Sequence, residues 1–231
     1  MMVIGGLQKI SVIDFPGKVS CVLFCAGCNF HCPYCHNPDL ISADIEPLFS
    51  GEAFQEFLEK RRGFLDGVVI TGGEPTLNED LAAWCGRIKD LGLAVKLDTN
   101  GSRPAVLERL LDSGCVDYLA MDVKTVPEKY PSLLAGGSFD PGNIRSSIEM
   151  IKQSGLDYEF RTTCVRPFVD EDVMSEVAGL VAGAPLYVLQ QCRLQRVLAP
   201  EFFDQTAEIG SEELERFRAL AAGQVDCCQI R

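Results

Sequence analysis

Short apolar runs rich in β-branched residues alternate along this chain with longer amphipathic stretches. Runs of roughly four to eight such residues are typical of buried strands, whereas apolar positions that recur about every three to four residues are typical of helices packed on a core. The pattern predicts strands at Val19–Phe24, Val68–Thr71, Ala94–Asp98, Tyr118–Val123, Tyr158–Val165 and Leu186–Gln190. It predicts helices at Gly51–Arg62, Asn78–Leu91, Pro104–Ser113, Asn143–Ser154, Glu171–Ala182 and Ser211–Ala222.

Polar residues and glycines at the ends of the predicted helices support these boundaries. Asn78 and Ser211 each stand before two acidic residues, as expected where a side chain caps the first turn and carboxylates complement the helix dipole. Gly92, Gly114 and Gly155 follow three of the helices. A helix often ends at a residue in the left-handed backbone conformation, and glycine adopts that conformation with little strain because it has no Cβ.

The alternation of strands and helices predicts an α/β fold with a parallel sheet and helices outside it. Six strand–helix units are too few for a closed eight-stranded barrel, and periodicity leaves open whether the sheet is a partial barrel or doubly wound. The length and the 47% hydrophobic content suit a single domain over residues 1–231. Within it we expect residues 1–18 to form an N-terminal extension or a hairpin over Gly5–Lys18. We expect residues 193–231 to form an irregular segment and a helix.

The formal net charge of −12 narrows the range of partners. An acidic protein repels phosphate backbones, so free nucleic acid is not an expected partner. The N-terminus has no basic region followed by an apolar run, and no apolar stretch approaches the ~20 residues that span a bilayer. We therefore expect a cytoplasmic protein that contacts no membrane and keeps its thiols reduced.

The chain contains eleven cysteines, which is many for its length. Four lie in apolar surroundings and are expected in the core: Cys21, Cys85, Cys115 and Cys164. Cys25, Cys227 and Cys228 are either incidental thiols, which we favour, or additional metal ligands. The sequence assigns no role to Cys192.

Three more cysteines lie within eight residues, at Cys28, Cys32 and Cys35. This spacing lets three thiolates reach one cubane cluster from one short loop, where they hold three irons of a [4Fe–4S] cluster and leave the fourth iron without a protein ligand. An iron with an open position can bind a substrate. Buried thiols or a disulfide pair are the alternative, but cysteines clustered this tightly in a reduced protein usually bind metal.

Polar residues also gather where the predicted strands end, in the runs Gly72–Pro75, Asp98–Gly101 and Asp122–Lys124. The carboxyl ends of parallel strands meet at one edge of a sheet, where ligands bind. Strand spacing places Asp122 and Lys124 on one face. Taken singly, the Gly-Gly-Glu run is most often a turn, Asp98 a helix cap and Lys124 a solvated lysine. The nearby cysteine motif favours a binding site.

Together these segments resemble the radical S-adenosylmethionine (SAM) enzymes that activate glycyl-radical enzymes, most closely the activating proteins of anaerobic ribonucleoside-triphosphate reductases. The resemblance rests on five runs in the first half of the chain: Ile13–Lys18, Cys28–Pro38, Gly72–Pro75, Asp98–Gly101 and Asp122–Lys124. It implies a partial (β/α)6 barrel of the radical SAM type. It also implies reductive cleavage of SAM at one [4Fe–4S] cluster, a glycyl-radical enzyme as protein substrate, and flavodoxin or ferredoxin as electron donor.

The resemblance implies roles for single residues near the cysteine motif. Cys28, Cys32 and Cys35 are similar to the ligands of the cluster. Tyr34 and His36 are similar to residues that lie beside the SAM adenine. Catalysis then belongs to the cluster and SAM, with no further catalytic residue implied.

The resemblance also implies a site for the methionine moiety of SAM. Its amino group would meet Gly72, Gly73 and Glu74. Its carboxylate would be organised by Asp98, Asp122 and Lys124, in some relatives through a monovalent cation. Arg161 is similar to an arginine that helps there, although a salt bridge at the edge of the core explains this residue equally well.

Two departures from the family pattern matter. Residues 36–71 contain no cysteine, so we predict one cluster and no ferredoxin-like insert. Some relatives place a histidine after the sixth strand, but here that strand ends in Gln190-Gln191-Cys192. The SAM contact on that side is therefore unassigned.

Two alternative functions remain open at the level of sequence. One is a small-molecule radical SAM enzyme, such as one that performs a deazapurine-type rearrangement, which would need polar pocket residues and Mg²⁺. The other is a non-catalytic iron–sulfur electron carrier, which would require a fourth ligand such as Cys25. Neither the identity of the activated partner nor the oligomeric state can be read from the sequence.

Overall fold

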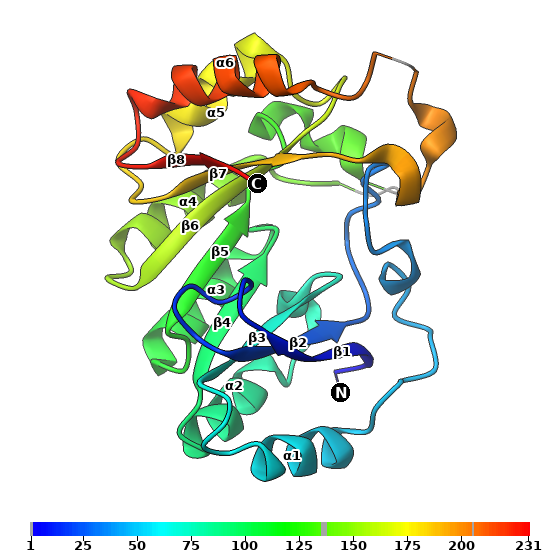
Figure 1. Cartoon of the computed structure of the whole chain (residues 1–231), viewed down its shortest axis with the longest axis vertical. Helices are drawn as coiled ribbons and strands as arrows, with labels where there is room; N and C mark the ends of the chain where they lie inside the picture. Colours follow the sequence, from blue (N-terminus) through cyan, green and yellow to red (C-terminus); the bar gives the residue numbers. More distant parts are fainter. Residues whose placement is uncertain (1, 135–137, 205) are drawn as a thin grey trace. The chain divides into compact units, whose positions relative to one another are not determined.

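The computed structural model describes residues 2–134, 138–204 and 206–231 (Figure 1). The chain forms two compact units, and the division falls inside strand β5 (Tyr118–Asp122). The first unit comprises Met1–Asn29, Asp39–Thr99 and Ala105–Leu119. The second comprises Phe30–Pro38, Asn100–Pro104 and Ala120–Arg231.

The first unit is built on β1 (Ile4–Ser11), β2 (Ser20–Cys25), β3 (Gly67–Gly72) and β4 (Ala94–Thr99). β1 is antiparallel to β2, whereas β2, β3 and β4 are parallel to one another. Leu23 pairs with Ile70, which pairs with Leu97, and all three side chains are buried. Strands buried on both faces have continuous apolar sequences, which explains why these runs show no alternation.

Three helices accompany these strands: α1 (Gly51–Lys60), α2 (Leu81–Asp90) and α3 (Pro104–Ser113). The Ser50 hydroxyl caps α1 by accepting a hydrogen bond from the amide of Ala53. Phe54 of α1 and Trp84 of α2 bring their ring centroids to 5.8 Å, so the two helices share an aromatic core.

The second unit carries β6 (Asp157–Cys164), β7 (Tyr187–Gln191) and β8 (Cys228–Ile230), which are parallel. Its helices are α4 (Gly142–Gln153), α5 (Glu171–Leu180) and α6 (Ser211–Ala222). α6 packs on α5 and β8, as Figure 1 shows. None of the helices in the described ranges is both long and apolar enough to span a membrane.

Short 3₁₀ turns fill the connections, at Pro38–Leu40 (η1), Pro75–Leu77 (η2), Pro127–Leu133 (η3), Leu194–Arg196 (η4) and Pro200–Phe202 (η5). Two of them lie in the segment after β7, which the sequence predicts as irregular. A proline stands in four of the five turns, where it fixes φ but donates no backbone hydrogen bond.

The α/β architecture with a parallel sheet is confirmed, and the six predicted strands and six predicted helices all occur. The predicted glycine stops are also confirmed, since Gly92, Gly114 and Gly155 have φ of 78°, 64° and 73°. Most element boundaries lie within two residues of the predicted ones, as with β6, which is shifted by one residue. The single domain over residues 1–231 remains a prediction.

Three local predictions were wrong. Gly5–Lys18 is not a hairpin in itself, because its strand β1 pairs with β2 along Ile4–Ser11. α2 begins at Leu81 rather than at Asn78, because the chain first makes the η2 turn and the Asn78 amide donates to the Pro75 carbonyl. Ser211 is the first residue of α6 and not its cap, which is Gly210.

Candidate functional site

Gly72 and Gly73 end β3 against the chain segment that leads into Cys28. Gly72 has a φ of 116°, and a Cβ there would lie 2.4 Å from the carbonyl oxygen of Cys25. A Cβ on Gly73 would lie 2.1 Å from the carbonyl oxygen of Gly27. The Gly73 amide donates to the Cys25 carbonyl at 2.8 Å. Both glycines are thus required for the strand end to approach the cysteine loop.

Glu74 is the acidic residue of this run, and its side chain is fully buried. Its Oε1 accepts hydrogen bonds from the Thr76 amide at 3.1 Å, from the Thr76 hydroxyl, and from the Thr99 hydroxyl at 2.8 Å. Its amide donates to the Gly27 carbonyl at 2.8 Å. The carboxylate therefore ties the end of β3 to the end of β4.

Cys28 is half-buried, and its amide donates to the carbonyl of Ile41 at 2.9 Å. This bond and the one from Gly27 to Leu40, at 2.8 Å, pair the start of the cysteine loop with the end of η1 and the residue after it. The first cysteine of the motif is thus held by backbone contacts within the first unit.

Asp98 is held by a lysine that the sequence analysis missed. Nζ of Lys96 lies 2.5 Å from Oδ1 of Asp98, and the lysine side chain is only 1% exposed. The same ammonium lies over the ring of Tyr118, 5.7 Å from its centroid. A lysine within the apolar strand Ala94–Thr99 was the available signal, since a buried lysine is rare without a partner.

In the second unit the structure brings Asp122, Lys124 and Arg161 together. Asp122 Oδ1 lies 2.8 Å from Nε of Arg161, and its Oδ2 lies 3.4 Å from Nζ of Lys124. The Lys124 and Arg161 side chains are 15% and 13% exposed. The predicted shared face of Asp122 and Lys124 is therefore confirmed, and the arginine joins it from β6.

This arrangement shifts the pKa values of two of the groups. Burial alone would raise the pKa of Asp122, but the charges of Arg161 and then Lys124 outweigh burial and hold it below its usual value. Burial alone would lower the pKa of Lys124, but the Asp122 carboxylate, followed by Cys32 and Tyr34, holds it well above its usual value. Asp122, Lys124 and Arg161 are therefore all charged at neutral pH.

Cys32 and Cys35 lie at the two ends of a backbone turn, in which the Cys35 amide donates to the Cys32 carbonyl at 2.9 Å. Burial raises the pKa of the Cys32 thiol, whereas the Lys124 ammonium opposes that shift and favours the thiolate. A cation close to this sulfur suits a cysteine that is to act as a metal ligand.

Tyr34 and His36 differ in their surroundings. Tyr34 is buried, its ring centroid lies 5.2 Å from that of Phe168, and its hydroxyl has no hydrogen-bond partner in the described part of the chain. His36 is exposed, with Nε2 3.2 Å from the carbonyl oxygen of Arg193. A buried hydroxyl without a partner is destabilising, so the Tyr34 hydroxyl is suited to meet a bound group.

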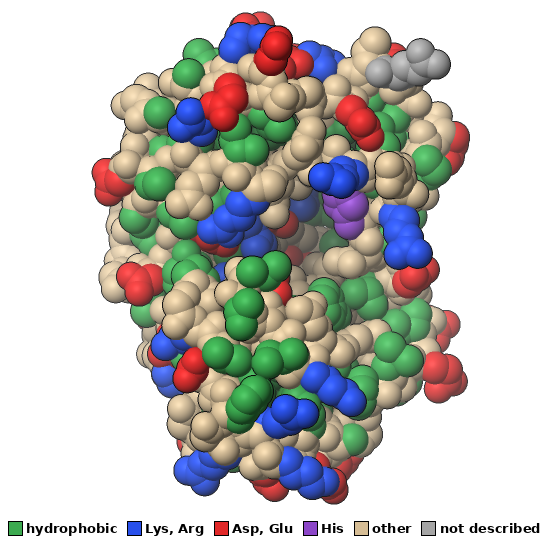
Figure 2. Space-filling model, viewed as in Figure 1, with side chains coloured by type: hydrophobic (Ala, Val, Ile, Leu, Met, Phe, Trp, Pro, Cys, Tyr) green, Lys and Arg blue, Asp and Glu red, His purple; other side chains and the backbone are tan. Residues whose placement is uncertain are grey.

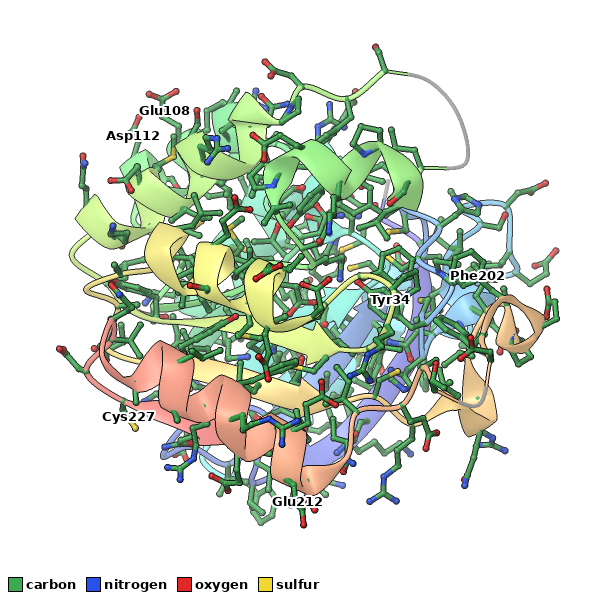
Figure 3. All side chains as sticks on the ribbon, turned by 90° about the horizontal axis from the view of Figure 1, so that it is seen from above. Tyr34, Glu108, Asp112, Phe202, Glu212 and Cys227 are labelled. Carbon is green, nitrogen blue, oxygen red and sulfur yellow. The ribbon has the colours of Figure 1, made fainter. Side chains whose placement is uncertain are left out.

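The remaining cysteines behave as packing residues or surface thiols. Cys21, Cys85, Cys115 and Cys164 are buried, as expected. Cys25 is fully buried, and its thiol contacts the sulfur of Met2 at 3.1 Å. Cys192 is buried as well, Cys228 is half-buried, and Cys227 is exposed and labelled in Figure 3. All eleven cysteines are described, and every one is a free thiol.

Within the described ranges, no group of three or more His, Cys, Asp or Glu side chains is placed so that it could hold a single metal ion. A cubane cluster makes a different demand, because each thiolate binds its own iron and the sulfurs stay farther apart than around one ion. The donor set of three thiols on one loop fits this demand. Within the second unit, the unpartnered Tyr34 hydroxyl beside Cys35 fits a bound group next to the loop.

Comparisons with known proteins agree with this arrangement. The profile of the Radical SAM superfamily matches residues 22–177. A Methanocaldococcus jannaschii protein with the provisional name glycyl-radical enzyme activating enzyme is 35% identical, over 99% of this chain and 95% of its own. The pyruvate formate-lyase-activating enzyme of Streptococcus mutans is 29% identical over 58% of this chain and 55% of its own.

A solved structure supports the fold. The crystal structure of Streptococcus suis SuiB bound to its precursor peptide SuiA superposes with a TM-score of 0.66 at 12% identity. It covers 88% of this chain, which spans 46% of that protein. At this identity the likeness concerns the fold alone. Since the superfamily profile covers more than half of the sequence and a relative above 30% identity covers nearly all of it, the chain belongs to the radical SAM superfamily of enzymes.

Proposed function

We propose that this protein generates a glycyl radical on a partner enzyme and that the partner is anaerobic ribonucleotide reductase. Similarity to an activating enzyme along almost the whole chain is the observation that carries the activase assignment. The choice of reductase rests on the resemblance of the Ile13–Lys18 and Asp98–Gly101 runs to the activating proteins of that enzyme.

The cysteine loop would hold the cluster through the thiolates of Cys28, Cys32 and Cys35. When bound, the cluster and SAM supply the one-electron cleavage of SAM and the abstraction of a hydrogen atom from a glycine Cα. The chain itself provides placement. Lys124 favours the thiolate of Cys32, and the amide of Cys28 is fixed by the Ile41 carbonyl.

The strand ends would hold the methionine moiety of SAM. Gly72 and Gly73, which let the end of β3 approach the chain before Cys28, would meet its amino group through their backbone. Glu74 would act by fixing that backbone, because its Oε1 is engaged by Thr76 and Thr99. Asp98, which Lys96 orients, would contribute to the carboxylate site, with or without a monovalent cation.

Asp122, Lys124 and Arg161 would complete the carboxylate site, since two cations and one anion leave an excess of positive charge there. Tyr34 and His36 would lie beside the adenine. A flavodoxin or ferredoxin would supply the electron. The acidic net charge makes a protein partner more suitable than free nucleic acid, and free thiols suit work in the cytoplasm.

The test combines the reconstituted protein with anaerobic ribonucleotide reductase from the same source, SAM and a reductant, without oxygen. We expect a doublet radical signal on the reductase, and we expect it to vanish when the C-terminal radical-site glycine of the reductase is replaced by alanine. SAM cleavage at the same slow rate with and without the reductase, and without a radical, would contradict the assignment. Other glycyl-radical enzymes and then small-molecule substrates would be tested next.

A further inference from the structure

Residues 193–203, which follow β7, lie directly against the second half of the cysteine loop. The amide of Leu198 donates to the carbonyl of Cys35 at 3.1 Å, and the amide of Ala199 donates to the carbonyl of Pro33 at 3.0 Å. These two bonds join the backbones of the segment and the loop. A protein seated on residues 193–203 would therefore be separated from Cys35 by this one segment.

A row of aromatic rings runs from this segment to the cysteine loop. The ring of Phe202 stacks on Phe168 with centroids 5.8 Å apart and planes at 19°, and Phe168 lies 5.2 Å from Tyr34. Phe202 is 52% exposed, whereas the other two rings are buried. Figure 3 labels both ends of the row. An exposed phenyl ring thus connects, through two ring contacts, to the residue before Cys35.

The same segment presents basic side chains in an acidic protein. Arg193 and Arg196 are both exposed, and neither has an ion-pair partner among the residues that the structure describes. The carbonyl of Arg193 lies 3.2 Å from Nε2 of His36. Figure 2 shows basic side chains next to a histidine on the face in view. In a protein of net charge −12, residues 193–203 thus carry two basic side chains and one acidic side chain, Glu201.

The acidic residues nearby are partly engaged in local hydrogen bonds. Oδ1 of Asp204 accepts from the amide and the hydroxyl of Thr206, at 2.7 and 2.6 Å. Oε1 of Glu208 accepts from the amide of Leu194 at 3.1 Å. Glu201 is exposed between the arginines and Asp204 in sequence. The two arginines and Glu201 are therefore the charges on this surface that are most available to a partner, and the cations outnumber the anion.

We propose that residues 193–203 form the docking surface for a small acidic protein that carries one electron. Phe202 would be the apolar contact, and Arg193 and Arg196 would attract the acidic rim of the carrier. One electron leaves the reduced carrier and reduces the cluster by one electron, and no bond or proton moves. The inference rests on the proposed function, since it requires a cluster held by Cys35.

Two physical considerations favour this surface. Electron tunnelling slows exponentially with distance, so the carrier has to approach the cysteine loop closely. Interfaces of electron-transfer partners are small and weak, and opposite charges mainly raise their rate of association. An exposed aromatic ring and two exposed arginines on one short segment suit such a contact.

The experiment compares Arg193→Glu/Arg196→Glu and Phe202→Ala with the control Arg62→Glu/Arg109→Glu. The control arginines are also exposed, lie in the first unit, and give the same change in net charge. Each reconstituted variant cleaves SAM with reduced flavodoxin or with dithionite as reductant. Binding of flavodoxin to each variant is measured separately by calorimetry at low and at physiological salt.

We expect the double arginine variant to bind flavodoxin about tenfold more weakly and to lose most of the salt dependence of binding. Its flavodoxin-driven rate should fall with binding, while its dithionite-driven rate stays at the wild-type value. Phe202→Ala should weaken binding and keep the salt dependence.

Equal binding by the two double arginine variants would overturn the docking surface, as would equal losses with both reductants. A wild-type protein that cleaves SAM with neither reductant would instead sink the proposed function, and this inference with it.

Discussion

Nε of Arg161 lies 2.8 Å from Oδ1 of Asp122, so β6 supplies a cation to the carboxylate at the end of β5. The same guanidinium lies 3.8 Å from Glu159, whose other oxygen is 3.4 Å from Arg231. Together with Lys124, these groups comprise three cations and two carboxylates. These five side chains thus carry one excess positive charge within a strongly acidic protein. An excess of this sign suits an anionic ligand such as a carboxylate.

Removing Lys124 is expected to weaken SAM binding and leave the cluster intact. Lys124→Ala deletes one charge-assisted contact, so the loss should be ~1.5–3 kcal/mol, or roughly ten- to a hundredfold in affinity. Calorimetric titration of the reconstituted protein with SAM measures this loss. Lys129→Ala, which removes an exposed lysine from the same unit, is the control. Unchanged affinity in Lys124→Ala would mean that this lysine only balances Asp122.

Asp122 should make the stability of the protein depend on pH in the acid range. Its folded-state pKa lies below the ordinary value of 3.8, so its contribution to the free energy of unfolding is complete above that value and disappears as pH falls through the lower folded pKa. Asp122→Asn should therefore flatten the decline of stability below about pH 4. Urea unfolding of the metal-free protein at a series of pH values tests this. The exposed Asp112→Asn variant should keep the wild-type slope, and identical slopes in both variants would contradict the assignment.

The strands and the polar residues at their ends were predictable because each depends on a local pattern. β3 is an unbroken apolar run followed by two glycines, and Asp122 and Lys124 share a face simply because side chains alternate along an extended chain. The radical SAM assignment depended in the same way on the spacing of three cysteines. Such features require no knowledge of which segments meet in space.

The features that escaped prediction are set by contacts distant in sequence. The pairing of β1 with β2 depends on backbone register, and three-residue β8 is too short to show a pattern. The hydrogen bond from the Thr99 hydroxyl to the Glu74 carboxylate joins the ends of two strands, and the sequence does not show it. Lys96 is an exception, since its partner Asp98 is only two residues away. It was overlooked because Asp98 was assigned to SAM alone.

Cysteine substitutions should separate the cluster ligands from the core thiols. Cys28→Ser, Cys32→Ser and Cys35→Ser should each lose the cluster, which the wild-type protein should hold at about four irons. Cys25→Ser is the matched control from the same stretch of chain, because its buried thiol packs on Met2. Iron content and the electron paramagnetic resonance signal of the reduced protein, with and without SAM, report the outcome. Loss of the cluster in Cys25→Ser alone would identify an iron–sulfur site without room for SAM.

Gly73→Ala should destabilise the protein and disturb the cysteine loop, because the new Cβ would lie 2.1 Å from the carbonyl oxygen of Gly27. Either β3 or the chain before Cys28 has to move, and the hydrogen bond from Gly73 to Cys25 weakens with it. We expect a loss of about 1–3 kcal/mol in the free energy of unfolding, the usual range for overpacking.

Gly86→Ala is the matched control, since Gly86 lies within α2 and a Cβ there meets open space. Alanine favours a helix over glycine by about 1 kcal/mol, so this variant should be as stable as the wild type or more so. Chemical denaturation of both metal-free variants measures stability, and iron content after reconstitution measures the loop. If Gly73→Ala unfolds like the wild type and still binds the cluster and SAM, the close approach of β3 to the cysteine loop has no role in building the site.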